Sequence, residues 1–277
     1  MTGAAGCVHH RYHGRVPEPD PRLVARLRAA GCVFAEDEAR LLTEAAASDA
    51  ELERLVARRV AGEPLEPLLG WVEFCGQRIH VDAGVFVPRR RTELLAGRAV
   101  ALAADTARRP GRPVVVDLCC GVGAIGAVVA ARVPTADVYA ADVDPFAVAC
   151  ARRNLPADRV FEGDLFAALP VGLRHRVDVL AVNAPYVPTD AIALMPPEAR
   201  DHEPATALDG GADGLEFHRR IAAEASVWLA PGGTLLIEAG EEQAPVSAAL
   251  FAASGLDTRI ESDEESGATM VIASAAG

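Results

Sequence analysis

The residues best suited to chemistry in this sequence are Asn183, Ala184, Pro185 and Tyr186, which follow an apolar run at 177–182. The run predicts a buried strand, and Pro185 ends it because proline has no N–H and a fixed φ. The Asn183 side chain and the Ala184 carbonyl each offer an acceptor oxygen, and Tyr186 offers a flat ring. Two acceptors beside an aromatic face suit a planar NH2 group. On these residues alone, a simple turn that closes the strand is an equal alternative.

A glycine-rich loop earlier in the chain is a second candidate for binding. Gly121, Gly123 and Gly126 fit the pattern GxGxxG between an apolar strand and a helix, and Asp142 ends the next strand. Glycines there let the backbone approach a ligand, and the acid accepts from ribose hydroxyls. The pattern does not separate a nicotinamide cofactor from S-adenosylmethionine, because both carry an adenosine. A tight turn without a ligand is the other interpretation.

Polar side chains end three consecutive strands, at Asp142, Asp164 and Asn183, and Asp117 lies at the junction before the glycine loop. The carboxyl ends of parallel strands meet at one sheet edge, where ligands bind. Asp164 could accept from an adenine amino group, or it could cap the segment that begins at Leu165. The series predicts a nucleoside site beside a reactive amide. That combination favours a methyltransferase acting on an NH2 group over a hydride-transfer enzyme.

The elements that must position these residues alternate from residue 113 onward. Strands are expected at 114–118, 138–142, 160–164, 177–182 and 234–238, helices at 124–132, 145–154, 214–229 and 243–253, and a terminal strand pair at 256–261 and 268–273. Alternating strands and helices predict an α/β fold with a doubly wound parallel sheet and right-handed crossovers.

The first ninety residues have a different character. Residues 1–19, which include Cys7 and three histidines, are expected to be a loose tail and not a metal site, because ligands need rigid support. Apolar residues at helical spacing predict three short helices between 21 and 62. Residues 63–70 read as a linker, and alternation on both sides of Cys75-Gly76-Gln77 predicts a β-hairpin. A helix is expected after Thr92 and Glu93, which could instead face a ligand beside Phe86.

Composition excludes several classes of protein. The formal net charge is −12, which is unfavourable for gripping a phosphate backbone. Six cysteines without a CxxC pair indicate a reducing compartment, not a zinc ribbon or a disulfide framework. The sequence contains no apolar run of about 18 residues and no signal-peptide pattern at its start. We expect a cytoplasmic protein with no bound metal and no membrane contact.

The ordered motifs resemble the HemK/PrmC-type N(5)-glutamine methyltransferases of class 1 peptide chain release factors, over about residues 20 to 272. The resemblance is carried by Gly62-Glu63-Pro64, Gly70 with Glu73-Phe74, Val87-Pro88-Arg89 with Thr92-Glu93, Asp117 through Gly123, Gly163-Asp164-Leu165-Phe166, Asn183-Ala184-Pro185-Tyr186, Glu203-Pro204 through Gly214-Leu215, and Gly232-Gly233 with Glu238.

This resemblance implies a seven-stranded, mostly parallel class I S-adenosylmethionine-dependent methyltransferase fold. It divides the chain into a tail at 1–19, a helical substrate-docking domain at 20–70, a β-hairpin linker at 71–90 and a methyltransferase domain at 91–277. The cofactor is S-adenosylmethionine. The protein partner is a class 1 release factor, whose Gly-Gly-Gln glutamine accepts the methyl group, and no direct contact with nucleic acid is expected.

The resemblance and the residue pattern together give a list of expected site residues. Asn183, Ala184, Pro185 and Tyr186 are the expected catalytic residues. The expected cofactor-binding residues are Phe86, Thr92, Glu93, Asp117, Cys119, Cys120, Gly121, Val122, Gly123, Asp142, Asp164, Leu165 and Asn183.

Three positions depart from the family pattern. Ala184 replaces the first proline of the usual Asn-Pro-Pro-Tyr, which should loosen the loop but keep the backbone carbonyl. Cys119 replaces a glycine, and its side chain either crowds the methionine part of the cofactor or points away. Met270 stands where the family has arginine.

Two other functions remain open on the sequence. Adenine-N6 methylation of DNA or RNA uses the same kind of NH2 acceptor, although such an enzyme needs a grip on the phosphates. A non-catalytic S-adenosylmethionine-binding protein would explain Ala184 and Cys119, but it would not explain why Asn183, Pro185 and Tyr186 are kept.

Overall fold

The computed structural model describes residues 18–277, so nearly all of the tail expected at 1–19 lies outside the described residues. The chain divides into two compact units, the first ending at Ala61 and the second beginning at Gly62. This division falls ahead of the boundary expected after residue 70. Residues 63–70, which the sequence indicated as a linker, therefore belong to the second unit.

The first unit consists of three helices, α1 (Pro21–Ala29), α2 (Ala35–Ala45) and α3 (Asp49–Val60), as the helical spacing predicts. Side chains cap two of them, because Asp20 Oδ1 accepts from Arg22 N at 2.8 Å and Ser48 Oγ accepts from Glu51 N at 3.3 Å. Each helix buries at least one apolar side chain, and such packing is how short helices gain stability beyond their own propensity.

The second unit begins with a short helix that the sequence did not predict, α4 (Leu65–Leu69). Its sequence contains Pro67, which indicated a linker. Proline is tolerated in the first turn of a helix, where its missing N–H has no intrahelical partner. The β-hairpin follows as expected, with β1 (Trp71–Phe74) pairing antiparallel with β2 (Gln77–His80). A 3-10 turn at Arg90–Thr92 then leads into α5 (Glu93–Thr106).

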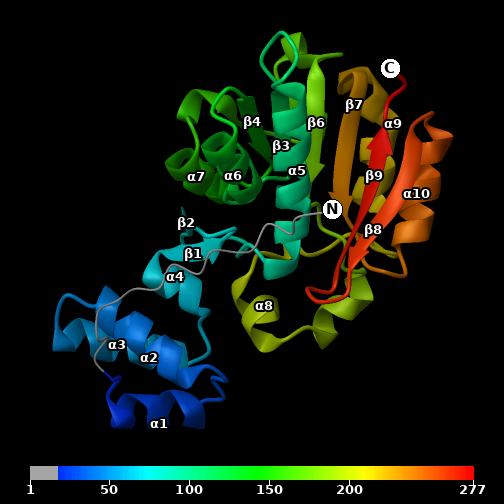
Figure 1. Cartoon of the computed structure of the whole chain (residues 1–277). Helices are drawn as coiled ribbons and strands as arrows, with labels where there is room; N and C mark the ends of the chain where they lie inside the picture. Colours follow the sequence, from blue (N-terminus) through cyan, green and yellow to red (C-terminus); the bar gives the residue numbers. More distant parts are fainter. Residues whose placement is uncertain (1–17) are drawn as a thin grey trace, which may run out of the picture. The chain divides into compact units, whose positions relative to one another are not determined.

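A seven-stranded sheet forms the centre of this unit, in the order β5-β4-β3-β6-β7-β9-β8 (Figure 1). Its strands are β3 (Val114–Leu118), β4 (Asp137–Asp142), β5 (Val160–Glu162), β6 (Val177–Val182), β7 (Leu229–Glu238), β8 (Asp257–Asp263) and β9 (Ala268–Ser274). Pairing is parallel except along β9, which is antiparallel to both neighbours. The doubly wound, mostly parallel sheet predicted from the sequence is confirmed.

Helices cover both faces of the sheet. They are α5, α6 (Ala124–Arg132) and α7 (Pro145–Asn154) on one face, and α9 (Glu216–Trp228) and α10 (Ala244–Ala253) on the other. Val115 joins the first core, and Val114 and Val116 join the second, because successive strand residues point to opposite faces. A short helix, α8 (Pro197–His202), lies in the long connection after β6. Among residues 18–277, no helix is long and apolar enough to span a membrane.

The strand order reverses between β3 and β6, which are neighbours in the sheet although β4 and β5 separate them in the chain. Open α/β sheets bind ligands at such a switch point, outside the carboxyl ends of the strands. The glycine loop follows β3, and Asn183 follows β6. The topology therefore brings the two candidate sites of the sequence to the same place.

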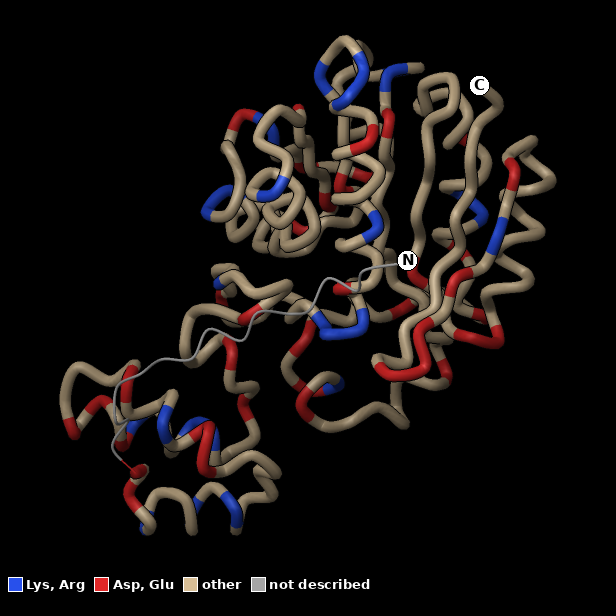
Figure 2. The backbone as a smooth tube through the Cα atoms, in the orientation of Figure 1, with Lys and Arg blue, Asp and Glu red and all other residues tan. Residues whose placement is uncertain are grey.

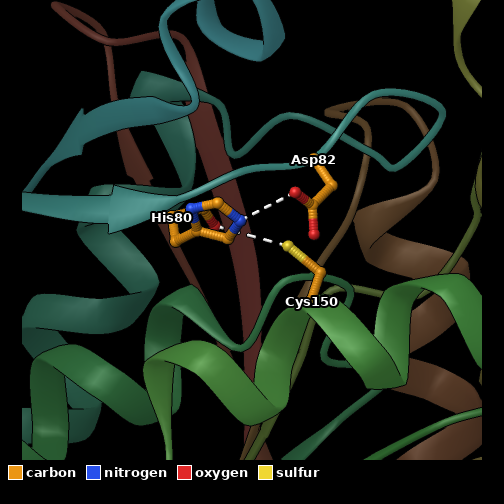
Figure 3. Close-up of side chains that lie close together, drawn as sticks. All are labelled: His80, Asp82 and Cys150. Carbon is orange, nitrogen blue, oxygen red and sulfur yellow. Dashed lines mark hydrogen bonds and ion pairs between the residues drawn. The ribbon is translucent and has the colours of Figure 1, made fainter.

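The hairpin is fastened to α7 by a small polar cluster (Figure 3). His80 Nε2 lies 2.8 Å from Asp82 Oδ1, and the Cys150 thiol donates to the His80 carbonyl at 3.5 Å. Asn154 exchanges two hydrogen bonds of 2.9 Å with the His80 backbone and donates a third, of 2.8 Å, to Val122 O. Potential metal-ligand atoms of His80, Asp82 and Cys150 lie within 4.8 Å of one another, and each already has a partner in the protein. The cluster holds the start of the segment that carries Phe86 and Thr92.

Candidate active site

A solvent-open cavity of about 960 Å³ lies at the carboxyl ends of β3, β4, β5 and β6. Expected site residues that line it are Phe86, Cys119, Gly121, Asp142, Asp164, Leu165, Asn183, Ala184, Pro185 and Tyr186. A smaller hollow shares four of these residues and adds Thr92, Cys120 and Val122. Asp117, Gly123 and Glu93 line neither space. The lining combines apolar side chains with a few polar groups, as in sites for cofactors and other small molecules.

The glycine loop places its backbone along the cavity wall. Gly121 has φ +53°, and a Cβ added there would meet no atom within 4 Å, so the missing side chain leaves open space. Gly123 has φ +74° and precedes α6. A Cβ on Gly126 would approach Leu155 and Val138 to within 3.3 Å, so this glycine allows close packing of the helix on the strand. The three glycines therefore have different roles, and Gly121 is the one that lines the cavity.

Cys119 occupies a backbone conformation that favours glycine, with φ +57°. Cys119 lines both the cavity and the adjoining hollow. Burial raises the pKa of the Cys119 thiol well above its ordinary value, and Asp142 and Asp117 add to the effect. The thiol therefore acts as a neutral, apolar part of the wall.

Asp117 holds the start of α6 after the glycine loop and does not line the cavity. Its side chain is 1% exposed, and Oδ2 accepts from Gly126 N at 2.8 Å. Oδ1 has no hydrogen-bond partner among residues 18–277. Burial raises the pKa of this carboxyl to about 8, against the Gly126 hydrogen bond, which lowers it. Asp117 is therefore held as a neutral acid over much of the neutral pH range.

Asp142 ends β4 at the cavity with both oxygens in use. Oδ2 accepts from Gly121 N at 2.7 Å, and Oδ1 accepts from Asp144 N at 2.9 Å. Burial raises the pKa of Asp142, and these backbone hydrogen bonds oppose the shift. Each carboxylate oxygen has a second lone pair. Asp142 can therefore accept ribose hydroxyls while it holds the glycine loop in place.

Asp164 and Leu165 line the far wall, after β5. Asp164 Oδ2 accepts from Arg220 Nη2 at 2.6 Å in a solvent-exposed pair, so one of its oxygens already has a partner. Leu165 has φ +47°, which directs the chain sharply away from the sheet edge. Phe86 lies against the cavity, with the Arg89 guanidinium 5.0 Å from its ring centroid. The wall thus offers one carboxyl acceptor and two apolar surfaces.

The loop after β6 is held by its side chains as well as its backbone. The Asn183 amide nitrogen donates to Thr92 Oγ1 at 3.2 Å, and Thr92 Oγ1 donates to Glu238 Oε2 at 2.7 Å. The Tyr186 hydroxyl donates to Glu238 Oε1 at 2.9 Å. Arg91 Nε donates to the same oxygen at 3.0 Å. Glu238 therefore connects both ends of the segment from Asn183 to Tyr186.

The Tyr186 ring is partly buried, and the Arg91 guanidinium lies 5.7 Å from its centroid. Burial raises the pKa of Tyr186 far above its ordinary value, and the charge of Glu238 adds to the shift. The phenol therefore stays protonated and acts as a hydrogen-bond donor. It is not a base at any ordinary pH.

A second loop, from Glu203 to Leu215, presses against the same segment. Val187 forms an isolated bridge with Asp209, through Val187 N to Leu208 O at 3.0 Å and Gly210 N to Val187 O at 2.8 Å. A Cβ on Gly210 would lie 2.7 Å from Tyr186 Cα, so only glycine fits there. Gln243 Nε2 donates to Tyr186 O at 2.9 Å and to Asp213 O at 2.9 Å.

Glu93 and Glu203 serve as braces outside the cavity wall. Glu93 accepts from Cys75 N at 2.9 Å, so it ties α5 to the turn of the hairpin. Glu203 accepts from Val87 N at 3.2 Å and from Arg89 Nη2 at 2.6 Å, so it holds the segment that follows Phe86. Burial raises the pKa of Glu203, and the Arg89 charge opposes that shift.

Several residues of this site are not among the expected site residues, and Arg91 and Glu238 are the two whose side chains hold Tyr186. Glu238 is 3% exposed and ends β7, so it is an acid at the carboxyl end of a strand, as Asp142 is. The same sequence signal could have indicated it. Arg91 carries no comparable signal, because it stands in a run of three arginines.

The sheet order and the open cavity at its switch point define a class I S-adenosylmethionine-dependent methyltransferase. The residues fit this cofactor: Asp142 keeps lone pairs for ribose hydroxyls, and Gly121 leaves open space beside them. The model of the "Methyltransferase small domain" family matches residues 78–195.

Comparisons with known proteins identify the family within this class. A release factor glutamine methyltransferase from Geobacter sulfurreducens is 38% identical over 79% of this chain and 75% of its own length. A 4-amino-L-phenylalanine/4-methylamino-L-phenylalanine methyltransferase from Streptomyces pristinaespiralis is 38% identical over 72% of this chain and 69% of its own length. A solved protein-(glutamine-N5) methyltransferase from Alicyclobacillus acidocaldarius is 25% identical, covers 69% of this chain and 95% of its own, and superposes with a TM-score of 0.43. The chain belongs to the release factor glutamine methyltransferase family.

Proposed function

We propose that this protein transfers a methyl group from S-adenosylmethionine to the side-chain amide nitrogen of a glutamine in a class 1 peptide chain release factor. The observation that carries the proposal is the position of Asn183, which follows β6 and lines the cavity together with Gly121 and Asp142. Family membership supports the acceptor, because the relative from Geobacter sulfurreducens is named for release factor glutamine.

In this proposal the segment from Asn183 to Tyr186 binds the acceptor amide. Asn183 Oδ1 and the Ala184 carbonyl accept its two N–H groups, and the Tyr186 ring packs against its planar face. Because Asn183 donates its own amide N–H to Thr92, Oδ1 is directed away from that hydroxyl. Pro185 restricts the backbone between the two groups.

The chemical difficulty is that an amide nitrogen is a weak nucleophile, since its lone pair is delocalised into the carbonyl. The cofactor supplies an electrophilic methyl group on a sulfonium. The chain contributes orientation of the nitrogen, which can remove several kcal/mol of barrier. The two acceptor oxygens also stabilise the positive charge that develops on the nitrogen. Tyr186 stays protonated, so proton loss to water after transfer fits the site better than removal by this residue.

The first unit, with α1 to α3, is proposed to dock the release factor, as the family resemblance implies. The expected location in the cytoplasm likewise remains a prediction. Adenine-N6 methylation is not favoured. The net charge is −12, and acidic residues dominate the turn between β8 and β9, where Figure 2 shows a red segment. Such a surface offers little for binding phosphates.

The test is a methyl-transfer assay with labelled S-adenosylmethionine and four acceptors offered separately: a class 1 release factor, duplex DNA, transfer RNA and 4-amino-L-phenylalanine. A release factor whose Gly-Gly-Gln glutamine is replaced by glutamate is the matched control. We expect label on the intact factor alone, and a single added methylene on that glutamine by mass spectrometry. Equal labelling of the control factor, or label on 4-amino-L-phenylalanine alone, would reject the proposed acceptor.

A further inference from the structure

Asn183, Thr92 and Glu238 form a chain of hydrogen bonds in that order. Thr92 and Glu238 are both 3% exposed, and neither lines the main cavity. Glu238 Oε1 accepts from Arg91 and Tyr186, and Oε2 accepts from Thr92. The chain thus runs from a carboxylate on β7, through a hydroxyl before α5, to the amide that ends β6. These three parts of the sequence meet only in the folded sheet.

The direction of each hydrogen bond follows from the donors that are present. A carboxylate that already receives an arginine N–H and a phenol O–H can only accept, so Thr92 must give its single proton to Glu238. Thr92 Oγ1 then has only lone pairs to offer Asn183. An asparagine amide has one accepting and one donating side, so its NH2 side must face Thr92. Its oxygen consequently faces away from Thr92.

We propose that Glu238 and Thr92 are positioning residues that set the Asn183 amide with its oxygen, and not its NH2 group, toward the methyl acceptor. This inference rests on the proposed function, because the acceptor is taken to be an N–H donor. The reversed amide would place two donors against the acceptor NH2 group. A site with that orientation would repel the nitrogen that it must bind.

The substitution Glu238→Gln distinguishes the orientation of the Asn183 amide from structural stabilisation of the loop after β6. Glutamine has nearly the same shape, but one side of its amide is a donor. Arg91 and Tyr186 both donate to Oε1, so the glutamine oxygen must stay there and its NH2 group must face Thr92. Thr92 then accepts from Gln at that position and gives its proton to Asn183. Asn183 has to turn its oxygen toward Thr92, and its NH2 group enters the acceptor site.

The kinetic test compares four variants with a release factor as acceptor. We expect Glu238→Gln to lower kcat about 100-fold. Thr92→Val should lower kcat about 10-fold, because the Asn183 amide is then free to turn but is not held in the reversed orientation. Thr92→Ser, which keeps the hydroxyl, should stay within about 3-fold of wild type. The double variant Thr92→Val, Glu238→Gln should recover to within about 3-fold of Thr92→Val alone, because valine cannot transmit the reversed bond. The Kd for S-adenosylmethionine should not change. A double variant worse than both single variants would mean that the chain is only structural, and the proposal would fail.

A second readout does not depend on any acceptor. In the wild type, NMR should show a nuclear Overhauser effect between the Asn183 side-chain amide protons and the Thr92 methyl group. Glu238→Gln should weaken it, because the NH2 group turns away. If the wild type labels no release factor but the effect behaves in this way, the proposed acceptor fails and the positioning role stands. An unchanged effect in Glu238→Gln overturns the positioning role. If Glu238→Gln does not fold, the kinetic comparison at Thr92 decides: Thr92→Val must lower kcat about 10-fold, and Thr92→Ser, which keeps the hydroxyl, must stay within about 3-fold of wild type. An equal loss in both variants overturns the positioning role.

Discussion

The two halves of the cavity are held by different kinds of contact. On the cofactor side, the hydrogen bonds from Gly126 to Asp117, from Gly121 to Asp142 and within 142–144 join residues 9, 21 and 2 positions apart. Each of these has a backbone N–H as its donor. The cofactor side is therefore built within two consecutive strands and the helix between them.

On the acceptor side, side chains from distant segments hold the loop after β6. Thr92 is 91 residues from Asn183 and 146 from Glu238, and Glu238 is 52 residues from Tyr186. Gln243 reaches the Tyr186 backbone over 57 residues. This difference implies that substitutions on one side should change cofactor affinity, and substitutions on the other should change the rate of transfer.

The largest effect on the cofactor side is expected from Asp142→Ala. The substitution removes the acceptor for ribose hydroxyls and the partner of Gly121 N, so the Kd for S-adenosylmethionine should rise about 100-fold by calorimetry. The matched control is Asp137→Ala, which removes an acid from the opposite end of the same strand. Its Kd should match the wild type. Equal weakening by both substitutions would mean that Asp142 acts only through the stability of β4.

Gly210→Ala is the corresponding test on the acceptor side. An added Cβ would lie 2.7 to 2.8 Å from three backbone atoms, including Tyr186 Cα and Pro185 O, and these cannot move independently. We expect kcat to fall about 10-fold with an unchanged Kd for S-adenosylmethionine. Gly172→Ala is the control, because a Cβ there meets no atom within 4 Å. A loss of cofactor affinity in Gly210→Ala would contradict the division between the two sides.

Asp117 predicts a pH dependence of stability that belongs to the cofactor side. Its pKa is raised to about 8 in the folded state, from 3.8. Between these values the folded state holds more protons than the unfolded state, so stability falls as pH rises, by up to about 1.4 kcal/mol per pH unit. Asp117→Asn removes this term. Chemical denaturation without cofactor should show similar stability for both proteins near pH 4 and a growing advantage for Asp117→Asn up to pH 8. A constant difference over that range would refute the assigned titration.

Arg220→Ala should have the smallest effect of the series. The Arg220–Asp164 pair is exposed, and such pairs contribute about 0–1 kcal/mol. The Kd for S-adenosylmethionine should change less than about 3-fold. A change above 10-fold would show that this pair orders the far wall of the cavity, and the cofactor side would then depend on a long-range contact as well.

The sequence predicts the cofactor side better than the acceptor side, because contacts on the cofactor side are local in the chain and contacts on the acceptor side are not. The glycine pattern and Asp142 lie in one strand-helix-strand unit, so their spacing alone indicates that they meet. Nothing in the spacing of Thr92, Asn183 and Glu238 indicates contact, because the order of β3, β6 and β7 in the sheet decides it. Asn183 was predicted from its own motif. Thr92 was expected only as a cofactor-binding residue, and Glu238 was not among the expected site residues.

Proline and glycine residues, which usually end helices and strands, were misleading where the tertiary structure tolerates them. Because of Pro67, α4 was not predicted, although proline fits the first turn of a helix. The strand expected at 234–238 begins at Leu229 in the structure, in spite of Pro231 and two glycines. The register of β7 against β6 shifts between Val177 and Val179, so a bulge accommodates these residues.

The most direct test of the account is Asn183→Ala, measured for cofactor binding and for methyl transfer in the same preparation. The account predicts a Kd for S-adenosylmethionine close to that of the wild type, because Asp142 and the glycine loop are unchanged, together with loss of detectable transfer to the release factor glutamine. Near-normal methylation by this variant would contradict it.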